Sequence, residues 1–572
     1  MRPTFLLPSL ILLNALQGFA ASDNLDPTHT LWYDEPARDW QHEALPIGNG
    51  RIGAMVFGGI SRERIALNEE TVWSGEPHDW NREGASEALP EIRRLLIEGE
   101  NKAAEKLVRQ RFTCVDGGSR RGARGPWGCF QELGNLRITW DFEVKPLALE
   151  NWKLREIETE RNKHPREIRR DVQGRLEKWS KPGVDTRGWE DYRIVDGEAL
   201  KGGRTLENNQ RMMLVKKLDL TQQQLAELGT LRISREARNG RVYVNGNEVG
   251  TFAGWNTAGQ DIFVRDVSQY LVEGENLIAI YCHKYRRRGG LPLAVTLEPK
   301  ITADSYHRRL DIADAIATTR FELDGVTYTR EAFASAPDQV MVFRFTADQP
   351  GQISFKASLD RMERFHTEAV GGDSLLMTGH TRANGAKDGM QFVARVKAMT
   401  SGGRVRTEGD ELVIDSADEA ILLVAAGTDY MGFAGRRTPD PVEATRQDIE
   451  QVSARDSYAA LRADHIADHR SYYDRMTLRL EDGDPASRQR ALAPTDERVE
   501  ALAEGKSDPA LSTLYFNYGR YLMISSSRPG TMPANLQGIW AEGIQTPWNC
   551  DYHIDVNVQM NYWPAEVTGL GD

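Results

Sequence analysis

The sequence has 572 residues, of which 40% are hydrophobic, and a formal net charge of −12. This length predicts two to four domains, and the 13 Trp, 17 Tyr and 17 Phe residues are typical of a globular rather than a disordered chain. The negative charge argues against nucleic acid or an anionic membrane surface as a partner.

Residues 1–20 have the pattern of an export signal. Residues 1–3 (MRP) are a short basic start, residues 5–16 are an apolar run, and residues 18–20 (GFA) offer small side chains before a cut after Ala20. The run is too short to cross a bilayer, and no later stretch is long and apolar enough to do so. We therefore expect a secreted or periplasmic protein without a membrane span.

The next part of the chain, residues 28–145, has mainly strand-like patterns. Asn49-Gly50 between apolar runs predicts a hairpin with residues 52–57 as its return strand. The string GNGRIG at residues 48–53 fits GxGxxG, but it opens onto a strand-like run, so we expect no nucleotide loop. Residues 87–112 have helical periodicity, with Gly99 ending the first of two helices.

Residues 146–300 interrupt this pattern as an insertion. In residues 151–179 acidic and basic residues alternate, which favours a solvated helical face over a nucleic-acid arm. Asn245-Gly246 predicts a second two-residue hairpin, followed by strands at residues 261–270 and 275–281. The string VYVNGNEVGTFAGWNTAGQDIFVRDVSQYLVEGENLIAIYCHK resembles the galactose-binding-like jelly roll attached to many glycosidases. That resemblance implies either a spacer or a glycan-binding module, with Trp255 as a contact.

Residues 301–437 return to strands separated by turns, the pattern of an antiparallel sandwich that the insertion divides. The strands are expected at residues 327–335, 339–345, 353–358, 390–398 and 412–426. Residues 438–493 are predicted to be a helical linker, with a helix over 439–476 and a polar stretch over 481–493. Residues 511–526 predict a strongly apolar helix.

Two groups of metal-capable residues stand out, and neither predicts a metal. His465 and His469 lie four apart on one helical face, but no HExxH pattern surrounds them, and solvated side chains are the favoured interpretation. The four cysteines allow three disulfide pairings; Cys114 with Cys129 is favoured, with free thiols as the alternative. None has the spacing of a zinc site.

The most informative stretch is TPWNCDYHIDVNVQMNYWPAE, residues 546–566. If it is extended, His553, Asp555 and Asn557 share one face, while Ile554 and its apolar neighbours pack on the other. Aromatic rings beside amides, an imidazole and a carboxylate are the chemistry that a sugar requires. The alternative is a half-buried strand with ordinary core aromatics.

Two long strings carry a family resemblance. LPIGNGRIGAMVFGGISRERIALNEETVWSG, from Leu45, and TMPANLQGIWAEGIQTPWNCDYHIDVNVQMNYWPAE, from Thr531, resemble glycoside hydrolase family 95, the inverting α-L-fucosidases. The resemblance implies a β-sandwich, a helical linker and, from residue 494 to residue 572, the beginning of an (α/α)6 barrel. It also implies a fucosylated oligosaccharide or polysaccharide as partner and no cofactor, since acid–base hydrolysis needs none.

The resemblance assigns roles by position. His553, Trp548, Tyr552 and Asn561 are expected to bind substrate, and Asp555 with Asn557 to position the water. The family motif ordinarily reads H-x-N-x-N, so Asp555 departs from it. A carboxylate there either accepts the water proton directly or only hydrogen-bonds a sugar hydroxyl.

The family's general acid is a glutamate further along the barrel, so we expect it beyond Asp572 and expect this chain to be truncated. Glu566 is tempting as the acid, but a packing or capping role is favoured. Two alternatives remain open: an α-L-galactosidase, because one added hydroxyl is hard to reject, or a glycan-binding fragment without catalysis. The sequence leaves the linkage, the natural glycan, the insertion's ligand and the oligomeric state undetermined.

Overall fold

The structure is a computed structural model. It describes residues 25–77, 79–115, 127–141, 146–158, 165–194, 206–207, 209–234, 239–253, 261–283, 291–292, 294–299, 303–385, 387–455 and 457–572. The export signal expected over residues 1–20 and the expected Trp255 contact lie outside these residues. Among the helices of the described part, none is long and apolar enough to cross a membrane.

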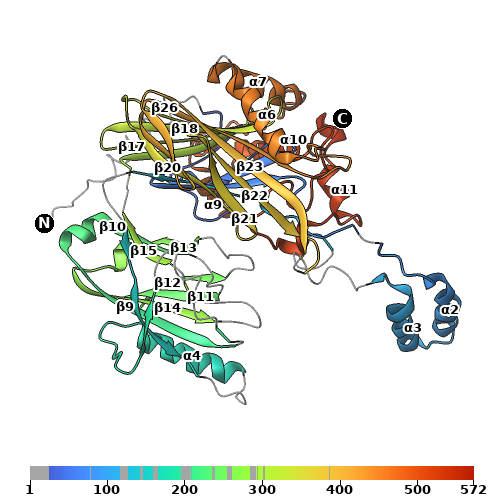
Figure 1. Cartoon of the computed structure of the whole chain (residues 1–572), viewed down its shortest axis with the longest axis horizontal. Coiled ribbons are helices and arrows are strands. Elements are labelled where there is room, and N and C mark those ends of the chain that lie inside the picture. Colours follow the sequence, from blue (N-terminus) through green and yellow to red (C-terminus); the bar gives the residue numbers. More distant parts are fainter. Residues whose placement is uncertain are drawn as a thin grey trace.

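Two large antiparallel sheets form a sandwich (Figure 1). The nine-stranded sheet contains, in spatial order, β1 (Thr30–Tyr33), β16 (Ser305–Asp311), β17 (Ile316–Leu323), β18 (Val326–Ser335), β19 (Val340–Ala347), β26 (Glu419–Thr428), β23 (Asp388–Ser401), β22 (Ser374–Arg382) and β21 (Phe365–Val370). The seven-stranded sheet contains β2 (Leu45–Gly48), β3 (Ile52–Val56), β4 (Arg62–Glu69), β5 (Gly134–Trp140), β20 (Ile353–Asp360), β25 (Glu411–Ala417) and β24 (Arg404–Glu408).

The core of the sandwich follows from period-2 burial along its strands. In β20 every second residue from Ile353 is buried, and Phe355 meets Phe345 of the opposite sheet with ring centroids 4.9 Å apart. Each sheet joins strands from both sides of the insertion, because β1 pairs with β16 and β5 pairs with β20. The two halves therefore share one core.

Several local predictions are confirmed. β2 and β3 pair as the hairpin expected around Asn49-Gly50, with Gly50 at φ +92°. The expected strands 327–335, 339–345, 353–358 and 390–398 correspond to β18, β19, β20 and β23. The single strand expected at 412–426 is wrong: β25 and β26 belong to different sheets, and Ser416 at φ +50° lies where β25 ends.

The insertion has two sheets and a hydrophobic core of its own, and Figure 1 shows it as a separate green lobe. One sheet is β13 (Asp261–Asp266), β10 (Leu228–Ser234), β15 (Ala294–Pro299) and β6 (Leu147–Ala148); the other is β12 (Asn247–Ala253), β11 (Asn239–Val244), β14 (Gly274–His283), β9 (Arg211–Leu220), β7 (Asn151–Glu156) and β8 (Glu190–Arg193). The Asn245-Gly246 hairpin is confirmed, with both residues at positive φ. The short helix α5 (Gln222–Glu227) follows β9.

The solvated helical face predicted for residues 151–179 is wrong. Its first part is strand β7, and the helix α4 (Pro165–Trp179) begins only later. Val172 and Leu176 of α4 are buried against Met213 and Val215 of β9. The charged residues mask this apolar stripe in the sequence, since only a few positions of the helix carry it.

Helices lie at two places outside the insertion. α2 (Leu89–Ile97) and α3 (Asn101–Leu107) project to the side of the sandwich in Figure 1, and Gly99 between them, at φ +80°, confirms the expected break. After β26 follow α6 (Pro441–Ser453), α7 (Tyr458–Tyr473), α8 (Pro485–Arg490), α9 (Thr495–Ala503), α10 (Pro509–Ser526) and α11 (Asn557–Tyr562).

The single helix expected over residues 439–476 is therefore two helices. Ser457 breaks the run because its side chain caps α7 by accepting the Ala460 N–H. The apolar helix expected over residues 511–526 is confirmed as α10, which Asp508 caps in the same way through the Leu511 N–H.

Candidate functional site

The most informative stretch of the sequence, residues 546–566, is not a strand. The chain makes a tight turn at residues 547–550, continues irregularly and enters α11. A strand needs a neighbouring strand for its backbone groups. Here those groups bond locally instead: the Val558 N–H donates to the His553 carbonyl, and the Met560 N–H donates to the Val556 carbonyl. The predicted extended conformation is wrong for this reason.

Two apolar side chains of the predicted strand are also exposed instead of buried. Ile554 is 75% exposed and Val556 is 45% exposed, so they do not pack as expected. Val556 has a φ of +87°, which a β-branched residue rarely adopts. This kink separates His553 from α11 and decides which side chains can meet.

Three of the six predicted site residues meet at one pocket. Trp548, His553 and Asn557 line a hollow of about 570 Å³. This volume is in the range of small-molecule sites. The remaining wall comes from the sandwich, from α10 and from the loop that follows α10, namely Trp40, Gln41, Pro46, Met55, Tyr518, Leu522, Leu536, Gln537, Trp540 and Pro547. The sequence does not indicate these residues, because no local pattern links Trp40 or Met55 to a motif about five hundred positions later.

His553 is held by a neighbouring carboxylate. Its Nε2 lies 2.7 Å from Oδ1 of Asp551, and both side chains are partly exposed. The pocket therefore combines three indoles, three side-chain amides and an imidazole.

Asp555, predicted to share a face with His553 and Asn557, lies instead in the turn before α11. Its side chain is exposed, and it is not among the residues that line the pocket. The predicted common face is wrong because the turn rotates residue 555 away from a strand geometry. Its next-but-one neighbour Asn557 is the first residue of α11 and does reach the pocket.

Tyr552 and Asn561 bind the protein's own backbone. The Tyr552 hydroxyl donates to the Pro533 carbonyl at 2.9 Å, and its ring stacks on Trp73 at 5.6 Å. The Asn561 side-chain amide donates to the carbonyl groups of Ala534 and Asn535. Both side chains thus hold the loop before the pocket, and neither is among the residues that line it. Glu566 is exposed and begins a short 3-10 turn.

The turn before His553 is strained. Trp548, Asn549 and Cys550 all have positive φ, between +47° and +58°. For residues with a Cβ this conformation costs roughly 1–2 kcal/mol each, with less for Asn. Such backbone persists only where its surroundings hold it, as the Phe130 N–H does by donating to the Asn549 carbonyl at 2.9 Å.

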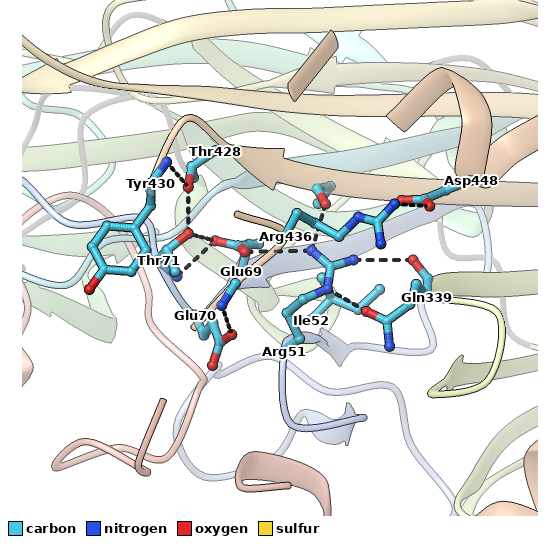
Figure 2. A network of polar contacts seen from close by, with 12 residues as sticks. Arg51, Ile52, Glu69, Glu70, Thr71, Gln339, Thr428, Tyr430, Arg436 and Asp448 are labelled. Carbon is cyan, nitrogen blue, oxygen red and sulfur yellow. Dashed lines mark hydrogen bonds and ion pairs between the residues drawn. The ribbon is translucent and has the colours of Figure 1, made fainter. Parts of the chain in front are cut away.

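A buried polar network joins residues 51 and 69–71 of the sandwich to Gln339, Thr428 and Asp448 (Figure 2). Arg51 lies 3.5 Å from Glu69 and donates to the Gln339 side chain at 2.5 Å. Glu69 also accepts from the backbone N–H and the hydroxyl of Thr71. Burial raises the pKa of Glu69 and lowers that of Arg51, and each partly offsets the shift of the other.

Glu70, next in sequence, binds different partners from those of Glu69. Its carboxylate accepts the Gly435 N–H at 2.9 Å and the Met532 N–H at 2.5 Å. Burial and the neighbouring Glu69 raise the pKa of Glu70 to about 8. Asn68 and Glu70 thus connect the sandwich directly to the loop that forms the pocket.

The histidine pair is structural. His465 and His469 are buried, not solvated as predicted, and their Nε2 groups donate to backbone carbonyls of Ile312, Asp314 and Ala315. Burial lowers their pKa to about 4 and about 3. Within the described residues no group of three or more His, Cys, Asp or Glu side chains is arranged to hold a metal ion.

The favoured Cys114–Cys129 disulfide is not present. All four cysteines are free thiols; Cys114 is exposed and the other three are buried. Cys129 and Cys550 both belong to the contact between the sandwich and the pocket region. The Cys129 thiol lies 3.3 Å from the Thr546 hydroxyl, and the Cys550 thiol donates to the Gln537 side chain at 2.6 Å.

Two family domains match the sequence. Residues 457–572 match the glycosyl hydrolase family 95 catalytic domain, and residues 31–148 and 265–432 match the glycosyl hydrolase family 65 N-terminal domain. The first match contains every residue predicted for the site. The second contains most of the sandwich strands and is interrupted within the insertion.

The chain is similar to proteins named as fucosidases. The chain is 27% identical over 559 residues to "Alpha-L-fucosidase 2" of Arabidopsis thaliana, covering 93% of this chain and 46% of that protein. It is 32% identical over 281 residues to "Probable alpha-fucosidase A" of Aspergillus niger, covering 47% of this chain and 34% of that protein. The chain therefore spans less than half the length of these two relatives.

Solved structures resemble the chain only distantly. A β-glucuronidase from an uncultured Clostridium sp. aligns with a TM-score of 0.22 and 14% identity, over 43% of this chain and 48% of that one. A score this low carries no argument about the fold.

Proposed function

We propose that this chain is a glycoside hydrolase of family 95, since residues 457–572 match the catalytic domain of that family, and that it releases terminal α-L-fucose from glycans by a single inverting displacement. The observation that carries the proposal is the pocket lined by Trp548, His553 and Asn557 within the matched catalytic region. Its substrate is a fucosylated oligosaccharide or polysaccharide. No cofactor takes part, since the reaction is acid–base hydrolysis.

Each side chain has a role in this proposal. The faces of Trp548, Trp540 and Trp40 accept the C–H face of the sugar, and His553 hydrogen-bonds its hydroxyls. Asn557 orients the attacking water. Asp555, two residues before it, is exposed and lies outside the residues that line the pocket, so in this proposal it acts from the pocket rim and accepts the proton of that water, which an amide cannot do. The general acid that inversion also requires is left unassigned.

The finer architecture is part of the same proposal. We assign α9 to α11 to the beginning of an (α/α)6 barrel. The helices α6 to α8 form the linker between the sandwich and that barrel. The insertion is a galactose-binding-like jelly roll. Export from the cytoplasm, with cleavage after Ala20, delivers the enzyme to extracellular or periplasmic glycans.

Proton NMR of the released sugar tests the reaction and its stereochemistry together. With an aryl α-L-fucoside, the β-anomer of L-fucose should form first and then mutarotate. Changing Asp555 and Asn557 together to alanine should lower kcat/KM by at least about 10²-fold, the lower range for lost acid–base catalysis. The exposed Met560 on the same helix is the matched control, and Met560→Ala should retain activity.

The same assay separates the alternatives. An aryl α-L-galactoside run in parallel shows whether the pocket tolerates the extra hydroxyl. Binding of fucosylated glycan without turnover would assign the chain a carbohydrate-binding role instead. Unchanged turnover in the double variant would refute the proposed roles of Asp555 and Asn557.

A further inference from the structure

The pocket depends on a loop with little regular structure. Residues 532–550, called here the anchored segment, contain one short 3-10 turn among their described elements, so their backbone polar groups need partners elsewhere. The segment supplies Leu536, Gln537, Trp540 and Trp548 to the pocket wall. Whatever fixes this backbone therefore fixes the pocket.

The partners come from two short runs of the sandwich. One run ends β4 and continues past it, and the other immediately precedes β5. From the first, the Asn68 side chain donates to the Ala541 carbonyl at 3.2 Å. From the second, the Gln131 side chain donates to the Ile544 carbonyl at 3.0 Å, and the Phe130 N–H donates to the Asn549 carbonyl.

Two buried glutamates hold the segment at separate points. Glu70 accepts the Met532 N–H at the beginning of the segment, and Glu132 accepts the Gly543 N–H at 2.7 Å near its middle. Glu132 also donates its own backbone N–H to the Gly543 carbonyl at 2.9 Å. The side chains of Glu70 and Glu132 are almost fully buried, at 3% and 1% exposure.

Each carboxylate uses both oxygens as acceptors. The second oxygen of Glu70 binds the Gly435 N–H, and that of Glu132 binds the Asn135 side-chain amide at 2.8 Å. A glutamine at either position has the same shape but only one acceptor, and its NH2 group would face an N–H donor. A carboxyl group, with an oxygen facing each donor, satisfies both partners.

A further contact ties Glu70 to the residues next to His553. The Trp73 indole donates to the Glu70 carbonyl at 3.0 Å, and its ring stacks on Tyr552, whose hydroxyl in turn binds the Pro533 carbonyl. Residues 70–73 thus hold the anchored segment at its beginning and again just past its end.

We propose that Glu70 and Glu132 are positioning residues of the pocket, which fix the anchored segment through its backbone N–H groups and so set the placement of Trp548 and His553. This inference rests on the proposed function for its catalytic consequence. The anchoring itself is a property of the protein that can be measured without turnover.

The experiment compares Glu70→Gln and Glu132→Gln with Glu63→Gln as a matched control. Glu63 lies on the same sheet, is 4% exposed and accepts the N–H groups of Phe57 and Gly58, but it does not contact the anchored segment. Hydrogen exchange of residues 532–550 should rise at least tenfold in the first two variants. It should change less than twofold in Glu63→Gln.

Turnover of an aryl α-L-fucoside provides the second readout. Displacement of the pocket should lower kcat by about 10- to 100-fold in Glu70→Gln and Glu132→Gln, with a KM change below about threefold, while Glu63→Gln retains its kcat. If Glu70→Gln does not fold, Glu70→Asp keeps the carboxyl group but shortens the side chain, and it should show the same pattern in part.

Two results would overturn the inference: unchanged exchange over residues 532–550 in both variants, or an equal increase in Glu63→Gln. If the unmodified protein releases no fucose, the proposed function fails by itself. The exchange measurement then still decides whether the two glutamates hold the segment.

Discussion

The sandwich and the C-terminal stretch both contain alternating apolar patterns, but only the sandwich converts them into strands. β20 (ISFKASLD) lies between β5 and β25 and bonds to both. Residues 553–558 (HIDVNV) belong to none of the sheets that the structure describes. Alternation therefore selects a face only where a neighbouring strand supplies the hydrogen bonds.

The two regions also differ in how they are held. The sandwich is held by its own interdigitated core, which includes Phe345 at 2% exposure. The pocket stretch leaves large side chains such as Trp548 and Trp563 at 77% and 65% exposure, and it is held mainly by hydrogen bonds to its backbone. The predictions below test this difference, beginning with the largest expected effect.

Removing a core ring from the sandwich should cause the largest loss of stability. Phe345→Ala should lower the free energy of unfolding by about 3–5 kcal/mol, because its ring packs against Trp140 and Phe355 and leaves a cavity. Phe365→Ala, on the edge strand β21 and 38% exposed, should cost less than about 1 kcal/mol. Urea unfolding of the two variants measures both, and equal losses would contradict the comparison.

Between the sandwich and the C-terminal helices lies a fully buried ion pair. Arg498 of α9 binds both oxygens of Asp508 and donates to the Pro27 carbonyl, which connects these helices to the segment just before β1. Arg498→Met should lower the free energy of unfolding by about 3 kcal/mol, because the buried Asp508 loses its charged partner. Arg479→Met, whose side chain is 76% exposed beside Glu481, should change it by less than about 0.5 kcal/mol in the same urea titration.

The sandwich should also show a pH dependence from Glu63. Burial raises the pKa of Glu63 to about 7, and the nearby Arg330 offsets only part of that shift. The folded state therefore keeps this proton to higher pH than the unfolded state, and stability falls as pH rises from about 4.5 to about 7. The expected loss between pH 5 and pH 7 is about 2 kcal/mol.

The difference between the unmodified protein and Glu63→Gln isolates this contribution, since the amide does not titrate. Denaturant unfolding at pH 5 and at pH 7 should show a smaller change with pH in the variant. A change of equal size in both proteins would show that Glu63 ionises without cost.

Much of the sandwich could be predicted because its signals are local. The Asn-Gly hairpins, the alternating strands and α10 each follow from a few adjacent residues, whether through turn geometry or through periodicity. Within residues 546–566 the structure brings Trp548, His553 and Asn557 to one pocket. Tyr552 and Asn561 do not line it, because their side chains bind a loop 19 and 27 residues earlier, and no local pattern indicates those contacts.

The anchoring of the pocket could not be predicted for a different reason. Met532 and Glu70 are 462 positions apart, and Gly543 and Glu132 are 411 apart. A carboxylate that accepts a backbone N–H leaves no pattern in the sequence of its partner, because every residue except proline carries that donor. Only the assembled fold reveals the contact.

The smallest expected effect is a change in stability, which should have opposite signs for glycine substitutions at two tryptophans. Trp548 has a φ of +47°, so Trp548→Gly should relieve strain and stabilise the protein by about 1 kcal/mol. Trp563 has a φ of −53°, where glycine only adds backbone freedom, and Trp563→Gly should destabilise it by about 0.5–1 kcal/mol. Thermal unfolding of the two variants measures this difference.

Fucoside turnover gives the second half of this test. Trp548 lines the pocket, so the more stable Trp548→Gly should bind an aryl α-L-fucoside more weakly, whereas Trp563→Gly should retain its KM. Stability and affinity then change in opposite directions at Trp548, as expected where strained backbone serves a site. A gain in stability without any loss of affinity would mean that the strained turn serves only the packing of the protein.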